Sequence, residues 1–274
     1  MSDAPDAPGT LLGAPLAGRS VVVTRTRAQA ASLVEPLEAF GAEVITMPVL
    51  ETVDPDDWAP ADAAIADLAG YDWVVFTSTN GIERFLRRFR RVGGSREVLL
   101  GRKFAAVGSA TAEKMRRHGL PPQLVPDDSR AEGLVEAFRA LGAGPGLRVL
   151  VPRALRAREV FPDALRALGA EVDVVPVYDT RPVPADPAVL QRFADGTVDC
   201  VSFTSGAIAR AFAGSLADTG VDPDTVLVGV AVASIGPVTT AALEALGYRA
   251  DIEAPEATME SLAAAIATFT AWKR

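Results

Sequence analysis

The chain is poor in the residues that most often bind metals or act as catalysts. Its 274 residues contain one cysteine, one histidine and three lysines. A single cysteine excludes an internal disulfide bond and a multi-cysteine zinc site. With a single histidine beside it, we expect neither a metal cluster nor catalytic machinery of the Ser-His-Asp or Cys-His type. Cys200 lies in an apolar, strand-like segment, so we expect a buried thiol, which suits a reducing cytoplasm.

Several signals of location and ligand class are also missing. No apolar run reaches the roughly 18 residues that cross a bilayer. Residues 1–17 lack the basic start and apolar core of a secretion signal, so we expect a loose, flexible tail there and a soluble, cytoplasmic protein with no membrane partner. The net charge of −8 argues against a nucleic-acid partner. Without a Walker loop or a G-x-G-x-x-G turn after a strand, the familiar kinds of nucleotide binding are disfavoured.

What the chain does contain is a long internal repeat. The segment "VVVTRTRAQAASLVEPLEAFGAEVITMPVLET" from Val21 is matched by "VLVPRALRAREVFPDALRALGAEVDVVPVYDT" from Val149. In the same order, "VVFTSTNGIERF" is matched by "CVSFTSGAIARAF", and "FAAVGSATAEKMRRHGL" by "VAVASIGPVTTAALEALGY". The offset between partners is nearly the same in all the blocks, as Gly41 with Gly169 and Gly108 with Gly236 show, which indicates a duplication.

Each repeated block predicts a strand followed at once by a helix. Continuous apolar runs such as "VVVT", "WVVFT" and "CVSFT" end in a hydroxyl-bearing residue, and an amphipathic helix follows. This alternation is typical of parallel sheets covered on both faces. We therefore predict an α/β protein with two similar parallel-sheet domains, and further short strands near Leu124 and Ile252.

The strand-to-helix turns are the predicted ligand site, because ligands of such sheets bind beyond the carboxyl ends of the strands, at the helix amino termini. These turns offer hydroxyls, backbone amides and two arginines. An alternative stays open: the hydroxyls are simply helix N-caps, each contributing about 1 kcal/mol. The candidate substrate-binding residues are Arg25, Thr77, Ser78, Asn80, Ser109, Thr111, Arg153, Thr204, Ser205, Gly236 and Thr239.

In its order of segments, the chain resembles uroporphyrinogen-III synthases. The resemblance runs from Arg19 to about Ile266, and its most specific pieces are "PVYDTRP" and "GPVTTAALEALG". It implies two interleaved α/β domains joined by a two-segment extended linker. One domain would combine residues 18–47 with 181–274 and the other would span 52–174, with linkers at 48–51 and 175–180.

The resemblance also implies the reaction. Members of the family close linear hydroxymethylbilane into a macrocycle, with loss of water and inversion of ring D, in haem and other tetrapyrrole biosynthesis. They are cyclising hydro-lyases that need no metal or organic cofactor. It further implies a monomer. Its partners would be the small-molecule substrate and, in a transient contact, the deaminase that catalyses the preceding reaction. A tetrapyrrole-binding or sensor module without catalysis is the alternative function on the same fold.

Two residues match family positions discussed for the site. Tyr178 in "VYDT" is the candidate catalytic residue, since a phenol can donate a proton to the departing hydroxyl; packing as an amphipathic aromatic is the alternative. Thr239 in "GPVTT" matches a threonine of the cleft, with N-capping as the competing explanation. Ala207 departs from the family pattern, where many relatives carry a hydroxyl or amide, so Ser205 and backbone amides would have to serve there.

Overall fold

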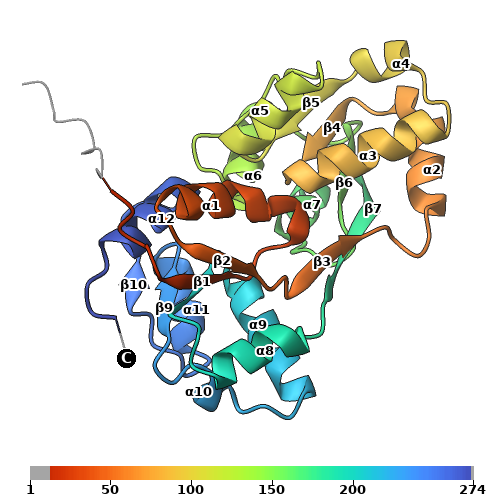
Figure 1. Cartoon of the computed structure of the whole chain (residues 1–274). Helices are drawn as coiled ribbons and strands as arrows, with labels where there is room; N and C mark the ends of the chain where they lie inside the picture. The colour runs from red at the N-terminus through yellow and green to blue at the C-terminus, as the bar shows by residue number, and fades with distance from the viewer. Residues whose placement is uncertain (1–12, 273–274) are drawn as a thin grey trace, which may run out of the picture. The chain divides into compact units, whose positions relative to one another are not determined.

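The computed structural model describes residues 13–272, and the chain divides into two compact units. Unit 1 comprises the described residues up to Glu51 together with those from Arg181 onwards, and unit 2 comprises Thr52–Thr180. Each unit is built around one five-stranded sheet, as the repeated strand-helix pattern predicts (Figure 1).

In unit 1 the strand order is β10-β9-β8-β1-β2, and every pair recorded in this sheet is parallel. The continuous apolar runs of the sequence supply the buried central strands. The elements are β1 (Ser20–Val23), α1 (Arg27–Ala39), β2 (Glu43–Thr46), α8 (Pro187–Ala194), β8 (Cys200–Phe203), α9 (Gly206–Asp218), α10 (Pro223–Val226), β9 (Ala231–Ser234), α11 (Pro237–Glu244), β10 (Ile252–Glu253) and α12 (Met259–Thr268).

Helices cover both faces of this sheet. Val21 and Val23 of β1 point to the face covered by α1 and α12, while Val22 points to the face covered by α8, α9 and α11. Segments from opposite ends of the chain therefore pack together, as the red α1 and the blue α12 show (Figure 1). Cys200 is fully buried on the α1 face, as expected, and burial raises the pKa of its thiol.

Residues 1–12 of the predicted tail lie outside the described residues, but its last part is ordered against the core of unit 1. Leu16 is fully buried, and its N–H donates to the carbonyl of Phe40 at 2.9 Å. The prediction of a loose tail therefore does not hold at Leu16, because this apolar side chain closes the end of the α1 face.

In unit 2 the strand order is β3-β7-β6-β4-β5, and β7-β6, β6-β4 and β4-β5 are parallel. Leu124 adds only an isolated parallel bridge to Ala105, so the strand predicted there is reduced to one residue pair. The elements are β3 (Leu50–Val53), α2 (Ala59–Ala66), the 3-10 turn η1 (Leu68–Gly70), β4 (Trp73–Phe76), α3 (Thr79–Arg91), α4 (Arg96–Leu100), β5 (Lys103–Ala106), α5 (Ser109–Arg117), α6 (Ala131–Ala140), β6 (Arg148–Ala154), α7 (Val160–Ala167) and β7 (Glu171–Pro182). The first two residues of β3 and the last two of β7 belong to unit 1.

The two faces of the unit 2 sheet are also covered by helices. Val74 and Phe76 of β4 pack with α2, α3 and α5, whereas Trp73 and Val75 pack with α6 and α7. Phe76 and Phe203 are counterparts in the repeat, and each is completely buried in its own unit. The duplication thus produces two separate hydrophobic cores of the same layered construction.

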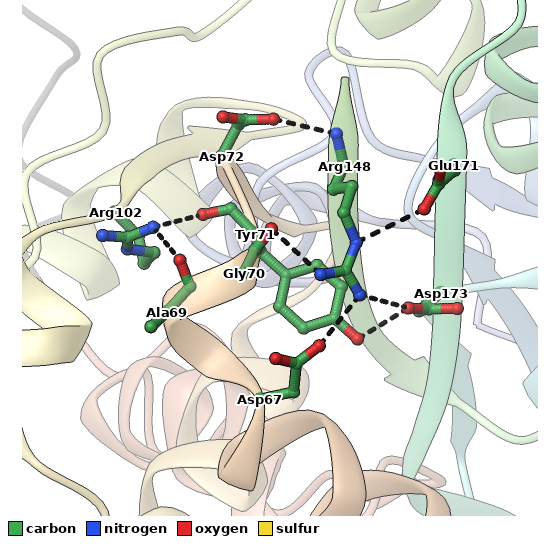
Figure 2. Close-up of polar contacts among 9 residues, drawn as sticks. All are labelled: Asp67, Ala69, Gly70, Tyr71, Asp72, Arg102, Arg148, Glu171 and Asp173. Carbon is green, nitrogen blue, oxygen red and sulfur yellow. Dashed lines mark hydrogen bonds and ion pairs between the residues drawn. The ribbon is translucent and has the colours of Figure 1, made fainter. Parts of the chain in front are cut away.

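The amino ends of the unit 2 strands are held by a polar cluster centred on Arg148 (Figure 2). The Arg148 guanidinium is 2.9 Å from a carboxylate oxygen of Asp67 and 3.4 Å from one of Glu171. It also lies over the ring of Tyr71, whose hydroxyl donates to Asp173 at 2.6 Å. Burial and this hydrogen bond raise the pKa of Tyr71. The cluster fastens β6, β7 and the segment before β4 together, at the opposite ends of the strands from the predicted ligand turns.

Candidate functional site

The candidate residues of unit 2 gather at the carboxyl edge of its sheet. Thr77 and Ser78 follow β4, Arg153 lies near the end of β6, and Tyr178 lies in the second half of β7. Because β4, β6 and β7 run parallel to their neighbours, these ends meet along one edge of the sheet. The turns after β4 and β6 therefore lie at the carboxyl edge of the sheet, as the strand-to-helix pattern predicts.

Ser78 and Tyr178 contact each other directly. The Ser78 hydroxyl lies 3.0 Å from the Tyr178 hydroxyl, and either oxygen can be the donor. Ser78 is also the N-cap of α3, where its Oγ accepts a hydrogen bond from the Gly81 N–H at 3.1 Å. The N-cap interpretation is thus confirmed for Ser78, and the same hydroxyl has a second partner that the sequence did not indicate.

A bulge in the β6-β7 pairing determines where Tyr178 points. Arg153 pairs with Pro176 but Ala154 pairs with Tyr178, so the register skips Val177. A bulge of this kind redirects a side chain to the other face of the strand. Val177 and Tyr178 accordingly both pack in the cluster on the α3 face, and Tyr178 is 8% exposed. Without the register shift, strict alternation would put these two neighbours on opposite faces.

Thr77 and Arg153 lie together in the wall of a cavity of about 280 Å³ on the α6–α7 face of the same edge. Phe161 and Val151 supply apolar surface, and the exposed Ser129, Arg130 and Arg158 supply polar groups. No sequence pattern marks these last three residues, because Ser129 and Arg130 directly precede α6 and Arg158 lies in a loop.

Arg153 is held inside the protein by neighbouring residues. It is 4% exposed, donates to the carbonyls of Arg158 at 2.7 Å and Ala157 at 3.4 Å, and forms an ion pair with Glu159. Its Nε is buried without a hydrogen-bond partner. Burial, with a smaller contribution from the charge of Arg166, lowers the pKa of the Arg153 guanidinium. The cavity wall thus contains a desolvated cation with an unused donor.

The remaining candidates of unit 2 lie at the starts of two helices. Asn80 is half-buried in the first turn of α3. Ser109 is exposed at the first position of α5, and Thr111 is buried further into the same helix. The cap of α5 is Gly108, which has no side chain to offer, so capping does not account for Ser109 or Thr111.

Unit 1 has a matching edge. Arg25 follows β1, Thr204 and Ser205 follow β8, and Gly236 follows β9, all in parallel register. Ser205 caps α9 by accepting from the Ile208 N–H at 3.2 Å. N-capping is therefore confirmed for Ser205 as it is for Ser78. Ala207 is exposed in the first turn of the same helix.

The other candidate residues of the unit 1 edge do not act as side-chain N-caps. Arg25 is half-buried; its Nε donates to the carbonyl of Gln29 at 3.0 Å and its Nη1 to the sulfur of Met259 at 2.8 Å. Burial lowers the pKa of Arg25. Gly236 is the backbone cap of α11, and Thr239 is buried inside that helix, so Thr239 is not the N-cap.

Over residues 13–272, no helix is both long enough and apolar enough to cross a bilayer. Within the same residues, no three or more His, Cys, Asp or Glu side chains are placed to hold a metal ion together.

Known proteins match this chain along most of its length. The family model described as uroporphyrinogen-III synthase HemD matches residues 31–264. A uroporphyrinogen-III synthase of Synechococcus elongatus is 36% identical over 258 residues, which is 92% of this chain and 96% of that protein.

Two solved structures share the fold. The crystal structure of a mutant uroporphyrinogen III synthase from the extremely thermophilic bacterium Thermus thermophilus has a TM-score of 0.60 at 18% identity, covering 89% of this chain and 95% of that one. The Helicobacter pylori 26695 uroporphyrinogen-III synthetase has a TM-score of 0.58 at 16% identity, covering 89% and 96%. The matches take in residues of both units, and they show that this chain belongs to the uroporphyrinogen-III synthase family, a family of lyases in tetrapyrrole biosynthesis.

Proposed function

We propose that this protein closes hydroxymethylbilane to uroporphyrinogen III, with loss of water and inversion of ring D. The observation that carries this proposal is the family match across residues 31–264, which includes every candidate residue of both units except Arg25. No observation favours the alternative of a tetrapyrrole sensor without catalysis. We further propose that the protein works in the cytoplasm as a monomer.

The substrate contains most of the reactivity that the reaction needs. Loss of its hydroxyl leaves an electrophilic azafulvene, and ring D must then attack through its substituted carbon to form a spiro intermediate that fragments and recloses. The enzyme's main task is to fold the flexible chain so that this hindered carbon attacks, and orientation of this kind can lower a barrier by several kcal/mol. A site with few strong acids and bases suits such a task.

Tyr178 is the proposed donor to the departing hydroxyl. Its phenol is fixed by burial of the ring and by the 3.0 Å contact with Ser78, so its hydroxyl has a defined position at the carboxyl edge of the sheet. A positioned general acid accelerates its step by about a hundred- to ten-thousand-fold at best, and a phenol belongs at the low end because it is a weak acid.

The acetate and propionate groups of the substrate are proposed to meet the helix amino termini and the arginines. The cavity beside Thr77 and Arg153 has room for a carboxylate arm, and Arg153 contributes positive charge to its wall. Arg25 offers a second guanidinium at the edge of unit 1. Backbone amides at helix starts add donors without adding net charge, which is how an acidic protein can hold a polyanion.

A brief contact with the preceding deaminase is part of the proposal. Free hydroxymethylbilane closes unaided to the symmetric type I ring, so a short passage between the two enzymes limits that loss. To test this contact, the purified deaminase would be mixed with this protein, and the fraction of type I product would be measured as the protein concentration is varied.

The activity is tested by supplying freshly made hydroxymethylbilane to the purified protein and separating the products by isomer. We expect mainly the type III isomer, whereas heat-denatured protein should give the spontaneous type I product. Mostly type I product with native protein would contradict the proposal. Tight tetrapyrrole binding without type III product would instead support the sensor alternative.

A further inference from the structure

We propose that Ser78 is a positioning residue for Tyr178: it holds the phenol by donating a hydrogen bond to it, so that the phenolic proton points toward the substrate. This inference rests on the proposed role of Tyr178 as donor to the departing hydroxyl. It assigns Ser78 a partner within the protein rather than a carboxylate of the substrate.

The contacts of the Ser78 hydroxyl favour this direction of donation. Its oxygen already accepts from the Gly81 N–H at 3.1 Å, and its own hydrogen remains available 3.0 Å from the Tyr178 oxygen. If Ser78 donates to that oxygen, the phenolic hydrogen must point elsewhere. The same hydrogen bond then stabilises the negative charge that develops on the phenol as the proton leaves.

The pair is fixed from both sides. Ser78 is immobilised as the cap of α3, and the Tyr178 ring is buried beside Val177 by the bulge in β7. Gly81 permits this close approach, because a Cβ at that position would lie 3.2 Å from the Ser78 Oγ and 3.0 Å from the carbonyl oxygen of Pro152. Geometry that is set before the substrate arrives is what a general acid requires.

The repeat supplies an internal comparison. Ser205 is the counterpart of Ser78 in the second half of the repeat, and it caps α9 in the same way at 3.2 Å. The counterpart of Tyr178 in the first half is Leu50, which packs against the core of unit 1. A serine cap therefore forms in this fold where the repeat counterpart of Tyr178 is a leucine, and the contact to Tyr178 is additional to capping.

Two substitutions separate capping from donation. Ser78→Thr keeps both the cap and a donating hydroxyl, and Ser78→Asp keeps a good cap but can only accept hydrogen bonds. We expect near wild-type kcat for the threonine variant and a fall in kcat of about ten-fold or more for the aspartate variant, with KM changed by less than about two-fold. If the aspartate variant kept wild-type kcat, donation by Ser78 would be excluded.

A role exercised through Tyr178 must disappear when the phenol is removed. In a Tyr178→Phe background we expect Ser78→Asp to cause no further loss of kcat. If the two residues acted independently, the fold reductions in kcat of the two single variants would multiply. Multiplied losses would overturn the inference. A raised KM with unchanged kcat would point to substrate binding by Ser78 and would overturn it as well.

A spectroscopic readout needs no activity. The chain has three tyrosines, so fluorotyrosine labelling gives three 19F resonances, and the Tyr178 signal is assigned by its loss in Tyr178→Phe. We expect Ser78→Ala to move this resonance and the matched Ser205→Ala, which also loses an N-cap, to leave it in place. An unmoved signal in Ser78→Ala would overturn the inference. Failure of the proposed function would appear separately, as type I product from the wild-type protein.

Discussion

Arg25 and Arg153 occupy equivalent positions in the repeat, at the ends of equivalent strands of the two units, yet their surroundings differ. Arg153 is almost fully buried and is tied to Glu159 and to two backbone carbonyls. Arg25 is half-buried and contacts the carbonyl of Gln29 in the helix that follows it and a thioether, which is a weak acceptor. The same position of the repeat thus holds a guanidinium with strong internal partners in unit 2 and one with weaker internal partners in unit 1.

The serine N-caps of α3 and α9 also occupy equivalent positions with different surroundings. Ser78 and Ser205 cap equivalent helices with nearly equal geometry. Ser78 has the phenol of Tyr178 as its second partner, whereas the repeat counterpart of Tyr178 in the first half is Leu50. Strand order and capping depend on backbone geometry that both units share. The chemistry depends on single side chains, and these differ between otherwise equivalent positions.

The largest effect is expected from core substitutions, which test whether the hydrophobic cores of the two units are separate. Phe76→Ala and Phe203→Ala each empty a fully buried site, and each should reduce the free energy of unfolding by about 3–5 kcal/mol. Because the two side chains lie in different clusters, hydrogen exchange should speed up mainly in unit 2 for the first variant and in unit 1 for the second. Equal acceleration in both units would show that the cores do not behave separately.

The next effect tests the residue that distinguishes the two units chemically. Tyr178→Phe keeps the buried ring and removes the hydroxyl, so kcat should fall about ten- to a thousand-fold while KM changes little. Single-turnover measurement of product formation, with the isomer ratio recorded, checks this. Unchanged turnover would remove Tyr178 from the mechanism and would leave packing as its role.

The smallest effects are expected from substitutions of Arg153 and Arg25, which test whether the two guanidiniums differ in their contribution to stability and to substrate binding. Arg153→Ala should lower the free energy of unfolding by about 1–3 kcal/mol, because it leaves the carbonyls of Arg158 and Ala157 without their donor. Arg25→Ala should cost less stability and should raise KM by about ten-fold through loss of a charge-assisted contact to the substrate. Denaturant titration and steady-state kinetics of both variants measure the two quantities. If Arg25→Ala were the more destabilised variant, the proposed contrast would be wrong.

Much of this fold could be predicted from the sequence alone. Apolar runs without alternation have both faces buried, so strands such as β1, β4 and β8 had to be central and parallel, with helices between them. The duplication followed from repeated letters at a nearly constant offset. The carboxyl edge followed as well, because parallel strands bring all their strand-to-helix turns to one side.

Other features depend on contacts that no local pattern encodes. The repeat alone does not determine whether strands pair within one half or between halves. Interleaving was implied by the family resemblance, and the tertiary structure shows which strands pair: β8 with β1 and β6 with β4. Leu16 lies in a segment rich in alanine, proline and glycine, and only the tertiary structure shows that its side chain packs in the cluster on the α1 face. The strand expected at Leu124 shrinks to one bridge, since a short apolar step has too few residues to extend a ladder.

The sequence by itself determined the layered α/β construction, its duplication and the edge at which polar residues collect, because these follow from periodicity and from the direction of parallel strands. The tertiary structure decided which of those residues meet. The contact between Ser78 and Tyr178 exists because a one-residue shift in the pairing of β6 and β7 turns the phenol toward the start of α3. A register shift arises from the fit between two strands, and neither strand specifies it alone.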